Sequence, residues 1–166
     1  MAYEIEQLPP DRIGEVEGLW GQLLAHHTWV APELAAIGAV RPAAESWRIR
    51  RGQYGTWLAE PGAAALVARG PAGLLGYAVV RVVDAPGSWQ WGDRSGVLET
   101  LVVDEAARST GVGLALLAEA RRRAAEQGAR ILKISVLAAN ERALRFYRRE
   151  GAVDFVHTLV LPLTTA

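Results

Sequence analysis

Apolar side chains recur at helical spacing in several stretches of this chain. Between residues 11 and 26 the large apolar residues fall three and four positions apart, which is typical of a helix with one buried face. Asp11 stands where a helix cap is expected. Related patterns predict further helices over residues 46–59, 111–127 and 141–150. In the sequence, two helices are therefore expected before the long apolar runs in the middle of the chain and two after them.

Shorter apolar runs between these helices are typical of β-strands. They cover residues 3–7, 64–69, 74–83, 96–103, 131–136 and 153–163. The sequence Gly-Pro-Ala-Gly at residues 70–73 predicts a hairpin turn. A strand–helix–strand unit follows in the second half, and such a crossover is parallel and right-handed. The order of elements predicts an α/β fold with antiparallel middle strands and one parallel crossover.

Composition narrows the class of protein. The chain has 166 residues, which suits a single domain over residues 1–166. Lys+Arg and Asp+Glu are 18 each, so the net charge is zero, which argues against nucleic-acid or membrane-surface partners. There are no cysteines, and the three histidines are too scattered to suggest a metal site. Because no signal peptide or membrane-spanning run is apparent, a cytoplasmic protein is expected.

Two glycines stand where the third helix should begin, in LVVDEAARSTGVGLALLAEA at residues 101–120. A dinucleotide-binding loop would need glycine or alanine where this chain has Leu116, and the Gly-Lys-Ser/Thr of a Walker loop is absent. A helix start with bare backbone can instead accept a pyrophosphate on its free N–H groups. Arg108, just upstream, adds a positive charge near the same anion.

The segment Arg108-Ser-Thr-Gly-Val-Gly113 resembles the Arg/Gln-x-x-Gly-x-Gly/Ala signature of the GCN5-related N-acetyltransferases, the GNAT family. In that family the signature binds the pyrophosphate of acetyl-CoA. LETLVVDEAAR before it and NERALRFYRREGAVDF after it are similar to the flanking family motifs. One difference is that Ala152 follows Gly151 where relatives usually have phenylalanine, and Phe155 comes later. The resemblance is strong over residues 96–155.

This resemblance implies a GNAT-type fold, with a mixed, mostly antiparallel sheet flanked by helices and the parallel crossover around the acetyl-CoA site. It also implies a set of cofactor-binding residues on the strand before the signature, in the signature, and on the last helix. These are Leu101, Val102, Val103, Arg108, Ser109, Thr110, Gly111, Val112, Gly113, Asn140 and Phe146. The backbone N–H groups of residues 101–103 would stabilise the oxyanion where two central strands splay apart. Asn140 is also a natural helix cap.

Two residues are predicted to carry the chemistry. Glu99 interrupts an apolar strand at the place where many relatives have a glutamate that acts through water, so it is the expected general base; the alternative is a solvent-facing strand residue. Tyr147 is the expected acid for the departing thiolate; the alternative is a core tyrosine. Without cysteine no acetyl-cysteine intermediate can form, which predicts direct transfer in a ternary complex.

The acceptor is not identified by the sequence. Residues His27, Trp29, Trp89 and Trp91 are possible substrate contacts, against the alternatives of helix-end electrostatics and packing. The expected function is an N-acetyltransferase that acetylates a small amine or a protein amine. The alternatives are a CoA-binding regulatory module without turnover, or an acyltransferase with another acyl donor or an oxygen acceptor. Many relatives pair through their last strands, so a homodimer is one option for the oligomeric state.

Overall fold

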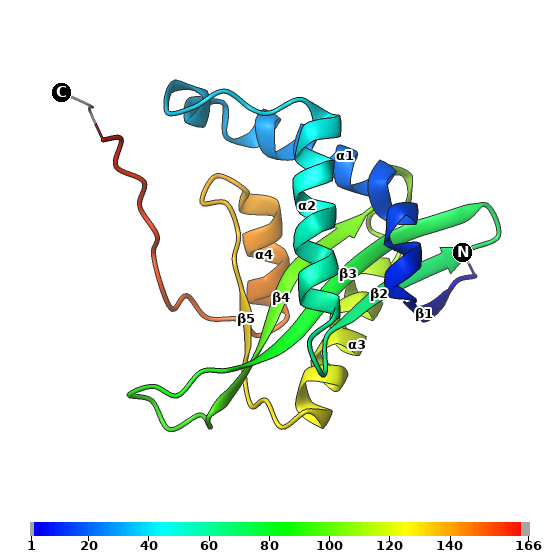
Figure 1. The fold of residues 1–166 in the computed structure, drawn as a ribbon, viewed down its shortest axis with the longest axis vertical. Helices are drawn as coiled ribbons and strands as arrows, with labels where there is room; N and C mark the ends of the chain where they lie inside the picture. Colours follow the sequence, from blue (N-terminus) through cyan, green and yellow to red (C-terminus); the bar gives the residue numbers. More distant parts are fainter. Residues whose placement is uncertain (1, 164–166) are drawn as a thin grey trace.

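A single mixed sheet organises the chain. The computed structural model describes residues 2–163. The strands stand side by side in sequence order (Figure 1) and are β1 (Glu4–Leu8), β2 (Ala64–Gly70), β3 (Gly73–Asp84), β4 (Arg94–Val103) and β5 (Leu132–Ile134). The first four are antiparallel neighbours, and β5 runs parallel to β4. The predicted α/β fold class, a mostly antiparallel sheet with one parallel crossover, is confirmed.

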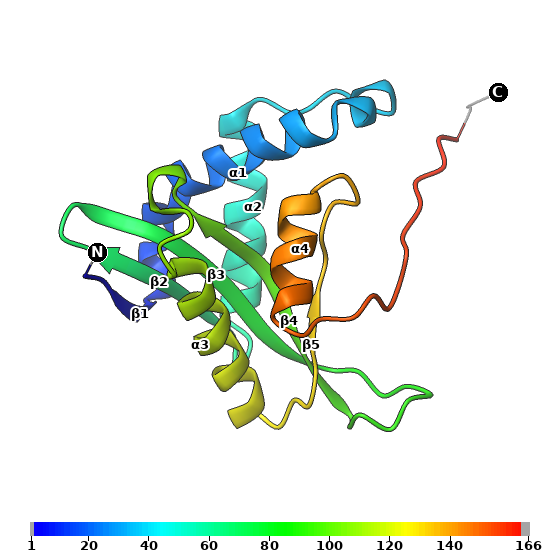
Figure 2. The same ribbon diagram turned by 180° about the vertical axis from the view of Figure 1, so that it is seen from behind.

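Helices cover both faces of this sheet, as the two opposite views show (Figures 1 and 2). On one face lie α1 (Glu17–Val30) and α2 (Ala43–Leu58), and on the other lie α3 (Val112–Glu126) and α4 (Glu141–Arg149). Short 3₁₀ helices complete the list: η1 (Pro10–Val16), η2 (Pro32–Ala36) and η3 (Glu105–Ala107). Within residues 2–163, no helix combines the length and the apolar character needed to cross a membrane.

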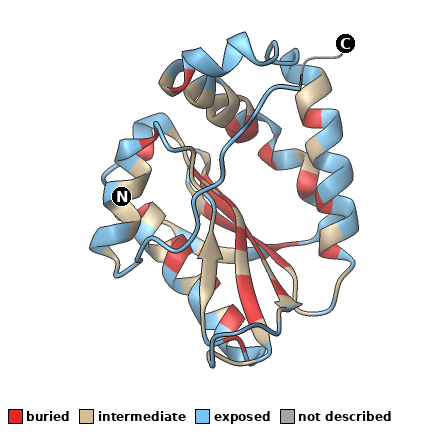
Figure 3. Ribbon diagram, turned by 90° about the vertical axis from the view of Figure 1, so that its left-hand side faces the viewer, coloured by how far each residue is buried: buried red, intermediate tan, exposed pale blue. Residues whose placement is uncertain are grey.

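Two apolar cores form because β2 and β3 are buried on both faces (Figure 3). Alternate residues of these strands point to opposite sides: Val67 and Val79 pack with α1 and α2, whereas Leu66 and Val80 pack with α3. Gly76 lets β3 approach β4 closely, since a Cβ there would lie 2.6 Å from a backbone oxygen of β4. Packing on both faces of the sheet thus fixes the position of β4, and the signature segment follows β4 along the chain.

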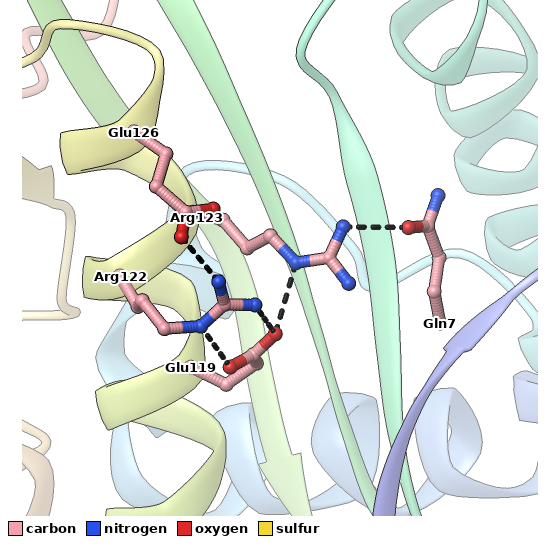
Figure 4. Close-up of polar contacts among 5 residues, drawn as sticks. All are labelled: Gln7, Glu119, Arg122, Arg123 and Glu126. Carbon is pink, nitrogen blue, oxygen red and sulfur yellow. Dashed lines mark hydrogen bonds and ion pairs between the residues drawn. The ribbon is translucent and has the colours of Figure 1, made fainter.

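The helix α3 matches its predicted pattern. Val112, Leu116, Leu117, Ala120 and Ala124 form its buried stripe. On the opposite side Glu119 accepts hydrogen bonds from Arg122 and Arg123, and Arg122 also pairs with Glu126 (Figure 4). Arg123 Nη1 donates to Gln7 Oε1 at 2.7 Å, which joins α3 to β1. Two of these ion pairs, Arg123–Glu119 and Arg122–Glu126, join residues one helical turn apart.

The first helix begins differently from the prediction. Residues 10–16 form a 3₁₀ helix that starts at Pro10, and its N-cap is Pro9, which makes no side-chain cap bond. Asp11 therefore lies inside the first turn and is not the cap. Pro10 sits naturally at this first helical position because it needs no backbone N–H partner there. The helix that follows, α1, ends at Val30 rather than near residue 26.

The predicted final strand is wrong. Residues 152–163 are extended but belong to no strand, and the segment leaves the body of the molecule (Figure 1). Its apolar side chains are exposed: Val153, Phe155, Val156, Leu159, Val160, Leu161 and Leu163. Only its beginning is anchored, by Arg148–Asp154 at 2.7 Å and by Phe155 against Trp91. An apolar run becomes a strand only where a second strand supplies backbone partners, and within residues 2–163 none pairs with this one.

Candidate active site

The sheet opens between β4 and β5. The parallel pairing joins only Gly96–Leu98 to Leu132–Ile134, and β4 then continues to Val103 without a strand on that side. The predicted residues 101–103 lie in this unpaired part. Leu101 and Val103 pack toward α3, whereas Val102 is buried toward α1 and α2. Their backbone at the opening is thus available to a ligand that enters between the two strands.

The segment that follows β4 is shaped by two left-handed residues. Ser109 has φ 66° and Gly111 has φ 92°. Alternation of right- and left-handed residues turns successive N–H groups toward one side, which forms a concave anion site. Thr110 is held within the turn, because its hydroxyl donates to the carbonyl of Ala107 at 2.6 Å. The loop is therefore fixed by its own hydrogen bonds before any ligand binds.

Gly111 is the N-cap of α3 and has no side chain that could satisfy the first N–H groups of the helix. The partial positive charge of this helix start adds to the charge of Arg108. Arg108 makes an ion pair of 3.5 Å with Glu105, which is largely exposed. Such an exposed pair is weak, so Arg108 can turn to a phosphate at little cost. Val112 is fully buried, so only its backbone can contribute to this site.

Three segments meet at Gly113. A Cβ placed there would lie 3.3 Å from Val103 Cγ2, 3.9 Å from Phe146 Cζ and 4.0 Å from Leu101 Cδ2. The signature loop, the unpaired part of β4 and the helix α4 are therefore neighbours. The structure brings together most of the predicted cofactor-binding residues at the open end of the sheet.

The start of α4 is capped as predicted. Asn140 Oδ1 accepts the backbone N–H of Ala143 at 3.1 Å, and the residue is only 7% exposed. This bond satisfies one of the free N–H groups at the helix start. The cap orients α4 so that Phe146 and Tyr147 pack against the core on the α3 side.

Tyr147 is well shielded from water. Its ring lies 5.0 Å from that of Phe146 in an edge-on arrangement. Burial disfavours the phenolate and raises the pKa of Tyr147 to about 12. At neutral pH the Tyr147 phenol is therefore protonated and can donate a hydrogen bond.

Glu99 occupies a β-bulge. Val80 pairs with Leu98 and Val79 with Thr100, so the register between β3 and β4 passes over Glu99. An extra residue in one strand changes which face the next side chains occupy. As a result Glu99 and Thr100 both point to the side of α2, where Thr100 binds a tyrosine of α2 and Glu99 meets an arginine. The bulge places the predicted base beside the unpaired part of β4.

An arginine holds Glu99 in place. Arg81 Nε lies 2.9 Å from Glu99 Oε1, and Arg81 Nη1 donates to both oxygens of Glu60. The Arg81 guanidinium also lies 5.2 Å from the ring centre of Trp57. The buried Nε of Arg81 has no hydrogen-bond partner among the described residues, because its N–H does not point at Glu99. Glu99, whose side chain is 18% exposed, is thus paired with Arg81 by charge rather than by a hydrogen bond from Nε.

A chain of buried hydroxyl groups lies beneath Glu99. Tyr54 on α2 contacts Thr100 at 2.7 Å and Tyr77 on β3 at 3.0 Å. Burial raises the pKa of both tyrosines, most strongly for Tyr77, so both phenols stay protonated at neutral pH. This cluster could not be predicted from the sequence, because each tyrosine fits an apolar pattern and the three residues come from distant segments.

The proposed acceptor residues lie in two separate places. His27 lines an apolar cavity between the end of α1, η2 and Leu137, and its pKa is lowered by burial first and then by His26 and Arg50. Trp29 is 78% exposed. Trp89 and Trp91 stack on each other in the loop between β3 and β4, at the far end of the sheet from α1 (Figure 1). The structure does not bring these tryptophans to the opening beside Glu99.

Comparisons with known proteins agree with this geometry. The model of the acetyltransferase (GNAT) family matches residues 24–152. A search of curated proteins finds no match.

Similar solved structures include a putative acetyltransferase from Pyrococcus furiosus, with 18% identity, 98% of this chain and 100% of that chain covered, and a TM-score of 0.74. A GCN5-related N-acetyltransferase from Ralstonia eutropha JMP134 has 20% identity, coverage of 96% and 98%, and a TM-score of 0.74. An aminoglycoside N-acetyltransferase, AAC(6')-Iy, in complex with CoA has 15% identity, coverage of 98% and 100%, and a TM-score of 0.70. At these identities the likeness concerns the fold.

Proposed function

The chain belongs to the GNAT acetyltransferase family, and on that premise we propose that it transfers the acetyl group of acetyl-CoA directly to an amine. The observation that carries the proposal is the left-handed, side-chain-free start of α3 beside the unpaired part of β4. A pyrophosphate needs free N–H groups, and a thioester carbonyl needs backbone donors; this arrangement offers both within one opening. The GNAT family uses acetyl-CoA as its acetyl donor.

The cofactor would lie along the opening. Its pyrophosphate would bind the N–H groups of residues 109–113, with Arg108 as counter-charge. Its thioester arm would enter between β4 and β5, next to Phe146, with the carbonyl oxygen facing the N–H groups of residues 101–103. Asn140 stands at the neighbouring helix start and is proposed as a further polar contact.

In the reaction, the nitrogen of the acceptor attacks the thioester carbon, the C–N bond forms, and the C–S bond breaks. A simple alkylamine with a pKa of ~10.4 is only about 0.04% neutral at pH 7, so the proton must be removed for attack. Glu99 would take that proton, directly or through one water, because its oxygens are not hydrogen-bonded to Arg81. The lack of cysteine in the chain favours a ternary complex over an acetyl-cysteine intermediate.

Tyr147 would act on the leaving sulfur. A pKa of about 12 means that full proton transfer to a thiolate of pKa ~8.5 is uphill by roughly 4–5 kcal/mol. The residue is therefore better suited to donate a hydrogen bond that stabilises the departing thiolate than to give up its proton completely. This sharpens the predicted role of a general acid.

Melting curves test the cofactor first. Acetyl-CoA at ~100 times its dissociation constant should stabilise the fold by about 2.7 kcal/mol, which is several degrees in Tm for a chain of this size. A melting curve that saturating acetyl-CoA does not move would refute the proposal.

Thiol release with a panel of amines then tests turnover. Tyr147→Phe and Glu99→Gln should each lower kcat while the stabilisation by acetyl-CoA persists. The control Glu126→Gln, an exposed glutamate at the far end of α3 from Gly111, should leave both unchanged. A protein that binds acetyl-CoA yet turns over no amine would be a regulatory module, and one that prefers longer acyl-CoA donors or alcohols would be a different acyltransferase.

We also propose that two copies pair through residues 152–163. This segment exposes seven large apolar side chains and extends away from its own core, so it does not cover that core (Figure 2). The outer edge of β5 carries no further strand within the described chain. Two identical copies can each offer a segment and an edge, which closes a symmetric dimer.

Light scattering measures this pairing. Wild type should have the mass of a dimer at micromolar concentration, and Leu159→Asp combined with Leu161→Asp should give a monomer. His157→Asp, on the same segment, is the control and should remain dimeric. A monomeric wild type contradicts the pairing and leaves the proposed reaction standing.

A further inference from the structure

Arg50 is an arginine without a counter-ion beside the proposed base. It lies on α2, is half-buried, and no carboxylate within residues 2–163 comes within ion-pair distance of it. Its neighbour Arg81 differs, because Glu60 and Glu99 both compensate its charge. A partly desolvated cation is stabilised by an anion, and here the protein does not supply one.

Aromatic rings fix the position of Arg50. Its guanidinium carbon lies 4.6 Å from the ring centre of Trp20, 5.5 Å from that of Trp57 and 5.7 Å from that of Tyr54. Contacts of this kind use the faces of the rings and of the guanidinium. The N–H groups of a guanidinium lie in its own plane, so a guanidinium held by its faces can still give a carboxylate two parallel hydrogen bonds. The side chain is thus held in place while its donors stay available.

This arginine is part of the same surface as Glu99. Trp57 contacts the guanidinium of Arg50 and also that of Arg81, which in turn contacts Glu99. Tyr54, under Arg50, is hydrogen-bonded to Thr100, the residue that follows Glu99 on β4. A short path of touching side chains therefore connects the proposed base to an open cationic group.

We propose that the acceptor is an amine that also carries a carboxylate, and that Arg50 binds this carboxylate while the amine faces Glu99. The inference rests on the proposed function, since it names the acceptor class of that reaction. A preference for a carboxylate would also distinguish this chain from acetyltransferases whose acceptors carry several positive charges. The charges of Arg50, Arg81, Glu60 and Glu99 sum to zero, so a polyamine would find no net acidic surface here.

Matched acids and carboxamides test the proposal. The panel contains glycine, β-alanine, 4-aminobutyrate, 6-aminohexanoate and leucine, each beside its carboxamide, with spermidine as the polycation. Rates are measured as thiol release at saturating acetyl-CoA and one fixed pH. At least one acid should exceed its carboxamide by about 10- to 100-fold in kcat/KM, the range expected for a charge-assisted pair of hydrogen bonds. In 4-aminobutyrate and 6-aminohexanoate the amine lies far from the carboxyl group, so the amine pKa of each acid is close to that of its carboxamide. A rate difference within these pairs therefore reports the effect of the carboxylate alone.

Arg50→Gln should remove that preference by slowing the acid while the carboxamide keeps its rate. Arg51→Gln, one residue further on the same helix and exposed, is the matched control and should retain the preference. Equal slowing of acid and carboxamide in Arg50→Gln would mean a structural role and would overturn the proposal. The proposal would also be overturned if, in wild type, every acid reacted at the same rate as its carboxamide, or if neither reacted at all. Stabilisation by acetyl-CoA alone judges the proposed function separately, because it needs no acceptor.

Discussion

Gly111 offers the most direct test of how the cofactor site is built. Its φ of 92° lies in the left-handed region, where a residue with a Cβ is strained. A Cβ at this position would meet only the hydroxyl of Tyr3, at 3.6 Å, which is an ordinary contact. Gly111→Ala therefore adds no clash, and its whole effect comes from the backbone.

The size of the effect follows from that strain. Forcing alanine into the left-handed region costs about 1–2 kcal/mol. For a chain of this length each kcal/mol corresponds to about 2–4 °C, so Tm should fall by about 2–8 °C. If the backbone instead relaxes, the N–H groups at the start of α3 rotate away from the cofactor. A tenfold weaker affinity would then leave about 1.4 of the 2.7 kcal/mol of stabilisation by acetyl-CoA.

Differential scanning fluorimetry with and without acetyl-CoA measures both effects. Gly113→Ala is the control: alanine favours the helix by about 1 kcal/mol, and its Cβ is only moderately tight, at 3.3 Å from Val103 Cγ2. It should melt near wild type and keep its response to acetyl-CoA. A Gly111→Ala protein that melts like wild type and shows the full response would refute the reasoning.

Three further predictions concern the fold around the site. Gly76→Ala should lower the free energy of unfolding in urea by about 1–3 kcal/mol, since its Cβ would lie 2.6 Å from Val102 O. Its control is Gly55→Ala on α2, where a Cβ meets nothing within 4 Å; this variant should raise the free energy of unfolding by about 0.5–1 kcal/mol. Asn140→Ala removes the cap of α4 and should cost about 1 kcal/mol by the same measurement; an unchanged midpoint would mean that the cap is dispensable. The arginines of α3 lower the pKa of Glu119 from 4.5 to about 2. The ionised carboxylate therefore stabilises the folded state above pH 4.5, and this contribution is lost as the pH falls toward 2. Glu119→Gln should flatten that part of the acid denaturation curve, and an unaltered curve would contradict the assignment.

Local patterns predicted the helices α3 and α4 well, because the signals for these helices are local. The buried stripe of α3 and the Asn140 cap of α4 each depend on residues within one or two turns. The same holds for the proposed anion site, since the left-handed Gly111 at the start of α3 is visible in the sequence as a glycine where a helix should begin. These features needed no knowledge of distant contacts.

The surroundings of Glu99 depend on distant contacts and were therefore hidden. Its orientation follows from the bulge, and the bulge exists only because β3 pairs with Leu98 and Thr100 but skips the residue between them. Periodicity along β4 alone cannot reveal a register that a second strand sets. Arg50 was missed for a related reason, because the absence of a counter-ion becomes visible only when every neighbouring segment is in place.

The C-terminal segment, residues 152–163, depends on a contact that residues 2–163 of its own chain do not supply. Its apolar residues are typical of a strand, but a strand needs a second segment to pair with, and residues 152–163 have no such partner within the described chain. Burial of such a segment against another copy would remove its exposed side chains from water without any change in sequence. The apolar pattern therefore predicts that the segment will be paired, whereas the location of its partner is decided by the fold, which directs the segment away from its own sheet.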